Sequence, residues 1–200
     1  LIVPGDAAAT ADHLRTSATL LRMGIASELL STILLIFAVL ALYRLFKGVN
    51  EKLALAMLTL ILVSVPISLL NVLHEIAALT MVSGAAFLLA FAKPQLDTQA
   101  YLFLRLHGQG LIVAQIFWGL WLFPYGMLVM RSGFIPRVLG ALLMIAGLAY
   151  VVSSFVSLFL PQSVHLVSQI AMVLGVGEWP MIVWLLIWGA KPQPVVATAT

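Results

Sequence analysis

The sequence predicts an all-α membrane protein, a polytopic bundle of transmembrane helices in a single integral membrane domain. Its 200 residues are 63% hydrophobic and 8% charged, whereas soluble domains usually carry about 25% charged residues. The apolar residues also gather in long runs, and a helix needs about 20 such residues to cross the hydrocarbon layer of a bilayer. We therefore expect the lipid bilayer to surround most of the chain.

Five apolar runs are long enough to be spans, and we expect one helix over each of residues 23–43, 53–73, 106–130, 138–160 and 166–189. Residues 1–22 are too polar to cross and should form an outer N-terminal segment. Asp6 follows Pro4 and Gly5 there, which makes it the expected N-cap of a helix. Residues 191–200 should form a flexible tail.

A sixth apolar run, residues 76–92, is shorter than the other five. Only His74 and Glu75 separate it from the preceding span, and neither residue favours turns. We therefore expect the preceding helix to continue beyond the membrane surface and to bend near Pro66 or Asn71. The segment 76–92 should then form a non-crossing or re-entrant helix.

The distribution of basic residues predicts the orientation, because cytoplasmic loops carry an excess of lysine and arginine. If residues 76–92 do not cross, one side holds more basic residues than the other. The larger group is Arg44, Lys47, Lys52, Arg131, Arg137 and Lys191, and the smaller group is Arg15, Arg22, Lys93 and Arg105. The side of the larger group, which includes the C-terminus, is then cytoplasmic.

In this orientation all four histidines fall on the outer side, and His74, His107 and His165 lie at the outer ends of three different spans. Three imidazoles with a carboxylate could ligate a transition metal, and two imidazoles on facing helices could hold a haem. Alternatively, these are interfacial residues bonded to their neighbours, because no spacing here matches a metal motif. The polar residues that could support such a site are Glu28, Asn71, Glu75, Arg105 and Gln169.

Small residues predict where helices approach one another closely. His107 shares one helix face with Gly110 and Ala114, so it could hold a ligand, pass a proton, or only bond across to the neighbouring helix. A second set of small residues recurs every seven positions in the fourth span, which predicts close packing and no chemistry. Its members are Gly140, Gly147 and Ser154.

Glu178 is the one carboxylate in the last span, and a charge at bilayer depth costs about 2.5–3.5 kcal/mol. Pro180 removes a backbone hydrogen bond one turn earlier, and together with Gly175 and Gly177 it predicts a discontinuous helix. Transporters place ion sites at such breaks, so Glu178 could bind a cation or relay protons. It could also be a protonated acid with a structural role.

Several classes of function are disfavoured. The chain has no cysteine, which excludes disulfides and thiolate metal sites. It has no basic face for nucleic acid, no phosphate-binding loop and no dinucleotide fingerprint. No motif specifies an enzyme or requires a cofactor, and we expect a non-catalytic protein.

Several strings together resemble one known family over nearly the whole chain. The most specific are Ile116-Phe-Trp-Gly-Leu-Trp-Leu-Phe-Pro124 and Ser132-Gly-Phe-Ile-Pro-Arg137. The others are Leu1-Ile-Val-Pro-Gly-Asp-Ala7, Ala41-Leu-Tyr-Arg-Leu-Phe-Lys47, Leu62-Val-Ser-Val-Pro-Ile67, Leu106-His-Gly108 and Trp184-Leu-Leu-Ile-Trp-Gly189. They resemble a bacterial membrane family described as domain of unknown function 4386. The resemblance implies a multi-pass protein of the bacterial inner membrane, with one further helix before Leu1, and it supplies no activity.

Three classes of function remain open. A binding or accessory subunit that partners other membrane subunits is favoured by the small size of the chain. A small ion- or proton-coupled transporter would be centred on Glu178. A haem- or metal-binding membrane protein would use His74, His107 and His165.

Overall fold

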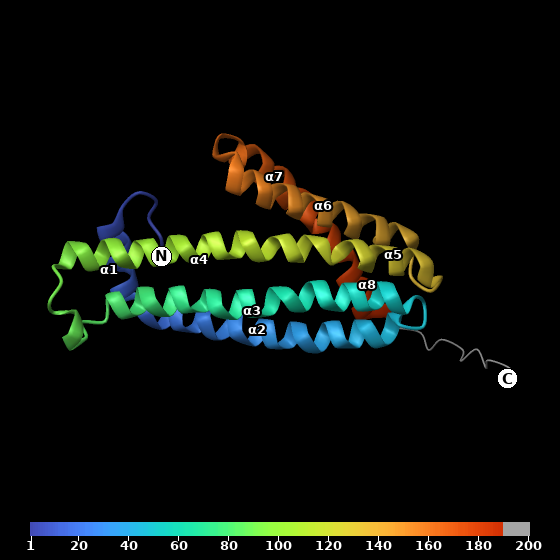
Figure 1. The fold of residues 1–200 in the computed structure, drawn as a ribbon, viewed down its shortest axis with the longest axis horizontal. Coiled ribbons are helices and arrows are strands. Elements are labelled where there is room, and N and C mark those ends of the chain that lie inside the picture. The colour runs from blue at the N-terminus through green and yellow to red at the C-terminus, as the bar shows by residue number, and fades with distance from the viewer. Residues whose placement is uncertain (190–200) are drawn as a thin grey trace. The chain divides into compact units, whose positions relative to one another are not determined.

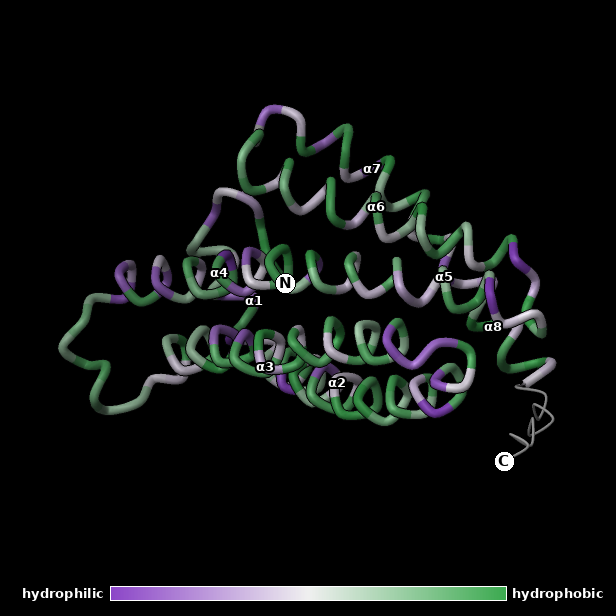
Figure 2. Tube along the Cα trace, turned by 45° about the vertical axis from the view of Figure 1, so that its right-hand side comes forward, coloured by the Kyte–Doolittle hydropathy of each residue, from purple (hydrophilic) through white to green (hydrophobic). Residues whose placement is uncertain are grey.

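The computed structural model describes residues 1–189, and within them every regular element is helical. Five helical segments are long and apolar enough to cross a membrane: Ala18–Phe46, Glu51–Met81, Lys93–Ser132, Arg137–Phe159 and Val164–Trp188. Each covers all or nearly all of one predicted run, so the prediction of an all-α bundle with five spans is confirmed. Hydrophobic residues follow these segments closely (Figure 2). The predicted tail, residues 191–200, lies outside the described residues.

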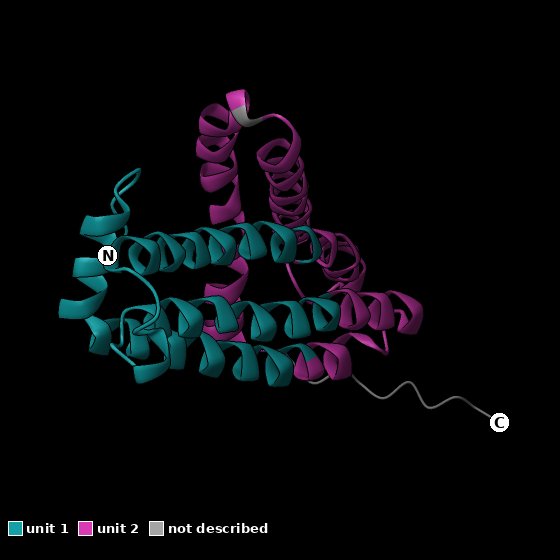
Figure 3. Ribbon diagram, turned by 60° about the vertical axis from the view of Figure 1, so that its left-hand side comes forward, with its two compact units in different colours: residues 1–39, 61–117 teal, residues 40–60, 118–200 magenta. Residues whose placement is uncertain are grey.

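The chain forms two compact units, each built from two stretches of sequence (Figure 3). The first unit comprises residues 1–39 and 61–117. The second comprises residues 40–60 and the chain from residue 118 onward. The long helices therefore contribute to both units, and each unit is described by itself.

The first unit contains α1 (Ala7–Thr16), most of α2 (Ala18–Phe46), the second half of α3 (Glu51–Met81) and most of α4 (Lys93–Leu120). Within this unit α2, α3 and α4 run side by side (Figure 1). Asp6 caps α1 as predicted, because its carboxylate accepts the backbone N–H of Ala9 at 2.9 Å. All four helices supply the apolar core of the unit, which consists of Leu14, Leu21, Ile25, Val72, Ala78, Ala100 and Leu104.

Residues 76–92 do not form a sixth span. Residues 76–81 complete α3, which continues as one helix through Pro66 and Asn71. A turn follows in which Gly84 adopts the left-handed backbone conformation, with φ of 72°, and glycine is the residue that adopts it most easily. The short 3₁₀ helix η1 (Ala86–Leu88) then leads to α4. The segment is therefore non-crossing, as expected, but the expected bend near Pro66 or Asn71 does not interrupt the helix.

An ion-pair cluster holds α1 against the start of α4. Asp97 is only 3% exposed, and its carboxylate pairs with the guanidinium of Arg15 and, at 2.9 Å, with the ammonium of Lys93. Arg15 also pairs with Asp12 at 2.7 Å, where Asp12 is largely exposed. The buried carboxylate is thus fully paired, and it connects the polar N-terminal helix to a span.

We expect Asp97→Asn to destabilise the first unit by about 1–3 kcal/mol, because it removes the buried partner of two cations. Asp12→Asn is the matched control and should change stability little, because exposed ion pairs contribute little. Thermal unfolding of the purified protein in detergent measures both effects. Equal effects of the two substitutions would contradict a special role for the buried carboxylate.

The second unit is organised around a helical hairpin. Pro124 lacks a backbone N–H, and its ring disfavours a helical carbonyl at residue 120, so α4 ends at Leu120 and α5 (Leu122–Ser132) begins just after it. Gly133, with φ of 72°, ends α5, and the chain reverses into α6 (Arg137–Phe159). The remaining elements are η2 (Pro161–Ser163), α7 (Val164–Gly175), η3 (Val176–Glu178) and α8 (Trp179–Trp188).

Two pairs of glycines bring the arms of this hairpin into contact. A Cβ atom at Gly119 would lie 2.7 Å from the Gly147 carbonyl oxygen. In the same way, a Cβ atom at Gly147 would lie 2.7 Å from the Gly119 carbonyl oxygen. Gly126 and Gly140 form a second reciprocal pair, with corresponding distances of 2.5 and 2.6 Å. The predicted close packing along α6 is therefore confirmed. The facing glycines have the same seven-residue spacing, with Gly119 at the end of α4 and Gly126 in α5.

Candidate metal centre

Three helices of the first unit turn titratable side chains toward one another, Glu28 from α2, Glu75 from α3 and His107 from α4. On α2, Leu21, Ile25 and Thr32 are buried. Glu28 lies on the same helix face, because it is three residues after Ile25 and four residues before Thr32. Its side chain is 25% exposed. The helix periodicity therefore explains why this carboxylate faces the neighbouring helices.

The same periodicity positions the other two side chains. On α3 the buried residues Ser68, Asn71 and Ala78 define a stripe that includes Glu75. On α4 the buried residues Ala100, Leu104 and Ala114 define a stripe that includes His107. The side chains of Glu75 and His107 are each 13% exposed.

Glu28, Glu75 and His107 form one cluster, which we call the carboxylate–histidine triad. The Nε2 atom of His107 lies 3.8 Å from Oε2 of Glu28 and 3.9 Å from Oε1 of Glu75. One ligand atom from each residue can be chosen so that all three lie within 4.8 Å of one another. The second oxygens, Oε1 of Glu28 and Oε2 of Glu75, are buried and have no hydrogen-bond partner among the described residues.

Asn71 is the residue that connects the triad to the surrounding helices. Its side-chain Nδ2 donates to the backbone carbonyl of His107 at 2.9 Å and lies 3.2 Å from Nδ1 of the same imidazole. Its Oδ1 lies 3.1 Å from Nδ1 of His74. Asn71 is 3% exposed, so its amide fixes both imidazoles in a buried network.

Gly110 allows this network to form. A Cβ atom at Gly110 would overlap the side-chain amide of Asn71, so α4 can approach α3 here only with glycine at this position. The sequence predicted that Gly110 and Ala114 permit a close helix approach, and the structure confirms it. The neighbouring helix is α3, and Ala114 is 1% exposed.

The structure brings together five of the residues that the sequence singled out. They are Glu28, Asn71, His74, Glu75 and His107. Arg105 is exposed on α4 and is not part of the triad network. His165 and Gln169 are exposed on α7 in the second unit, so their predicted part in the site stays a prediction. The sequence singled out His107 as a possible ligand and gave Glu28 and Glu75 only a supporting role, whereas the structure places all three side chains together.

Glu178 lies in a separate environment in the second unit. The helix is interrupted there, as predicted, because α7 ends at Gly175 and η3 precedes α8. The Tyr150 hydroxyl of α6 forms a hydrogen bond with the Glu178 carboxylate. A Cβ atom at Gly175 would lie 2.9 Å from the Tyr150 ring, so the glycine also makes room for the tyrosine. These contacts favour a structural role for Glu178.

The donor set of the triad is suited to a cation. Carboxylate oxygens and a neutral imidazole nitrogen are ligands for divalent first-row metals, and thiolate is not required. Two ligand atoms of a tetrahedral zinc ion lie about 3.4 Å apart, given bonds of about 2.1 Å. The observed separations of 3.8 and 3.9 Å need only small side-chain movements to reach that value.

The chain resembles one known protein family over most of its length. The family described as "Domain of unknown function (DUF4386)" matches residues 1–189. The chain belongs to this family. An uncharacterized protein of Archaeoglobus fulgidus is 39% identical over 83 residues, which are 42% of this chain and 48% of that protein. The match thus spans about half the length of this relative. No solved structure matches.

Membership in the DUF4386 family agrees with the resemblance seen in the sequence strings. Together with five helices able to cross a membrane, it supports a multi-pass membrane protein. Because one relative is archaeal, similar sequences are not confined to bacteria. Neither finding specifies an activity.

Proposed function

We propose that this protein is a membrane protein that binds a divalent metal ion through Glu28, Glu75 and His107. The observation that carries the proposal is the convergence of these three ligand atoms, from three helices, within 4.8 Å. The two buried carboxylate oxygens without a partner in the described residues add to it, because a buried charge is stable only when it is paired or bound to a metal.

The surroundings of His107 supply what a metal-bound imidazole needs. A histidine ligand usually donates its second ring N–H to a carbonyl or carboxylate, and Nδ1 of His107 lies 3.4 Å from the backbone carbonyl oxygen of Asn71. In that tautomer Nε2 is free to bind the ion between the two carboxylates. Three protein ligands leave coordination positions for water or a substrate.

The alternative for the same triad is a bound proton. Nδ2 of Asn71 lies closer to Nδ1 of His107, at 3.2 Å, and if it donates there, Nε2 carries the proton and faces the carboxylates. The two tautomers predict different behaviour toward metal ions. A haem is less suited to this site, because the imidazoles of His74 and His107 both contact the amide of Asn71.

Metal binding can be tested on the purified protein in mild detergent. After treatment with a chelator, we expect it to take up about one equivalent of Mn²⁺ or Zn²⁺, measured by calorimetry and elemental analysis. His107→Ala should abolish this uptake. His165→Ala and Glu178→Gln, which change polar residues of the second unit, should leave it unchanged. A metal-free wild-type protein, or equal losses in the control variants, would contradict the proposal.

The other functions expected from the sequence stay predictions. An accessory role would appear as partner subunits in a mild-detergent pull-down. Transport through Glu178 would appear as a flux in proteoliposomes that Glu178→Gln removes. Location in a bacterial inner membrane with a cytoplasmic C-terminus is also a prediction.

A further inference from the structure

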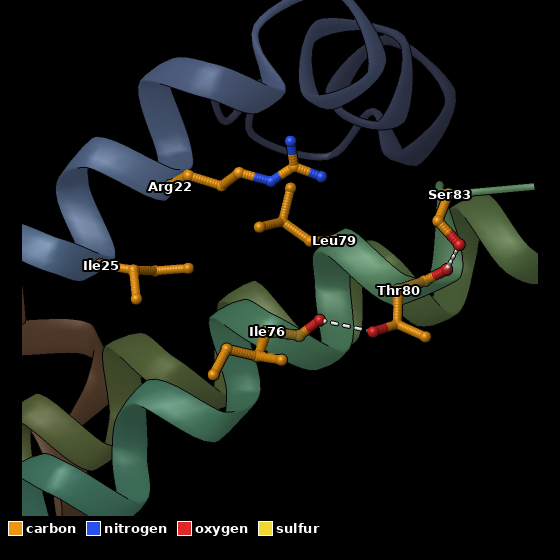
Figure 4. A pocket seen from close by; sticks show the side chains of 6 residues that line it. All are labelled: Arg22, Ile25, Ile76, Leu79, Thr80 and Ser83. Atoms are coloured by element: carbon orange, nitrogen blue, oxygen red, sulfur yellow. Dashed lines mark hydrogen bonds between the residues drawn. The ribbon is translucent and has the colours of Figure 1, made fainter.

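A second candidate site lies in the same unit, between α2 and the end of α3. It is an open cavity of about 350 Å³ lined by Arg22, Ile25, Ile76, Leu79, Thr80 and Ser83. Figure 4 shows the Arg22 side chain extending from α2 toward Leu79 on α3. This volume is at the lower end of the range for ligand pockets, so the cavity can hold part of a small molecule or of a lipid.

The only charged group of the lining is the guanidinium of Arg22. Arg22 is exposed, and no hydrogen bond or ion pair of its side chain is found within the part of the chain that the structure describes. This differs from Arg15 one helix earlier, which pairs with two carboxylates. An arginine without a partner, beside apolar surface, is suited to bind an anion.

The two hydroxyl groups of the lining are already used as donors. Thr80 donates to the carbonyl of Ile76 at 2.8 Å, and Ser83 donates to the carbonyl of Thr80 at 2.7 Å (Figure 4). Arg22 is therefore the main donor that the cavity offers to an anion. The remaining side chains are aliphatic, and they suit a hydrocarbon chain.

We propose that this cavity binds an anionic phospholipid, with its phosphate at Arg22 and part of one acyl chain against Ile25, Ile76 and Leu79. Arg22 directly precedes the predicted span 23–43 and lies near the N-terminal end of α2, so we expect it at the depth of the lipid head groups. The lining contains no carboxylate, so a zwitterionic lipid would leave its ammonium group without a partner. The proposal is independent of metal binding at the triad.

The test is native mass spectrometry of the detergent-purified protein after incubation with equal amounts of phosphatidylglycerol and phosphatidylcholine. We expect the wild-type protein to retain phosphatidylglycerol preferentially. Arg22→Gln should reduce that retention about fivefold, since one basic residue near the surface contributes about 1 kcal/mol to binding an anionic lipid. Leu79→Trp, which fills the cavity, should reduce retention of both lipids.

Arg44→Gln is the matched control, because it makes the same change at an exposed arginine near the other end of α2. The proposal is wrong if Arg22→Gln and Arg44→Gln have equal effects, or if the two lipids bind equally well. Displacement of the lipid by inorganic phosphate alone would also overturn it, because the cavity would then recognise free phosphate. Thermal unfolding confirms that each variant is folded, and Arg22→Gln, at an exposed position, tests the site without altering the core.

Discussion

Replacement of Gly140 by leucine should prevent the second unit from packing correctly. A Cβ atom at this position would lie 2.6 Å from the Gly126 carbonyl oxygen and 3.2 Å from the Met130 backbone nitrogen. Both neighbours are backbone atoms held in α5, so they cannot move aside as a flexible side chain would. We expect a loss of about 3 kcal/mol or more, at or beyond the upper end of the usual cost of overpacking.

The measurement is the yield of monodisperse protein in detergent together with its melting temperature. Gly24→Leu is the matched control, because a Cβ atom at Gly24 on α2 meets nothing within 4 Å. The control should behave like the wild-type protein. If Gly140→Leu gave an equally stable protein, the close contact between the arms of the hairpin would be wrong.

The glycine spacing explains why the hairpin tolerates no such change. Gly133 is at the reversal, and the paired glycines lie seven residues on either side of it, at 126 and 140, and fourteen residues on either side, at 119 and 147. Equal offsets from a turn place residues opposite one another in an antiparallel pair. Both glycine contacts are therefore consequences of one turn and one repeat length.

Only half of this arrangement was predicted from the sequence. The repeat within 138–160 indicated one packing face, because small residues at helical spacing are readable within a single span. The partner face, at Gly119 and Gly126, required the position of the turn, which apolar runs alone do not reveal. The same limit applies to residues 76–92, where composition predicted a non-crossing segment after a helix that bends near Pro66 or Asn71, but not that this helix would end at Met81.

The triad shows the same limit for the candidate site. The helical period of α4 predicted that His107 faces another helix, as it does in the structure. Hydropathy alone predicted the spans. Which residues of α2 and α3 face His107 depends on how far each helix is shifted along its neighbour. That shift is set by contacts such as Gly110 against Asn71, and these involve residues from distant parts of the sequence. The sequence therefore emphasised three histidines, whereas the structure places two glutamates beside one of them.

Neutralising either carboxylate of the triad should abolish metal binding and also stabilise the metal-free protein. For Glu28→Gln and Glu75→Gln we expect metal affinity to fall at least about 100-fold, the upper end of what outer-shell changes cost. In the absence of metal, each wild-type carboxylate has a buried oxygen without a partner among residues 1–189. An amide in place of one carboxylate removes the repulsion between like charges and can donate a hydrogen bond to the other.

The measurement is the melting temperature of each variant with and without metal. The wild-type protein should gain about 2.7 kcal/mol at a metal concentration 100 times the dissociation constant, and the two variants should gain almost nothing. Glu51→Gln, an exposed glutamate in the first turn of α3, should match the wild-type protein in both conditions. A triad that holds a proton predicts a different pattern, because glutamine resembles a protonated glutamate and would leave the metal-free stability unchanged. If one substitution raises the melting temperature without metal and lowers it with metal, relative to the wild-type protein, the triad binds a metal ion through charged carboxylates.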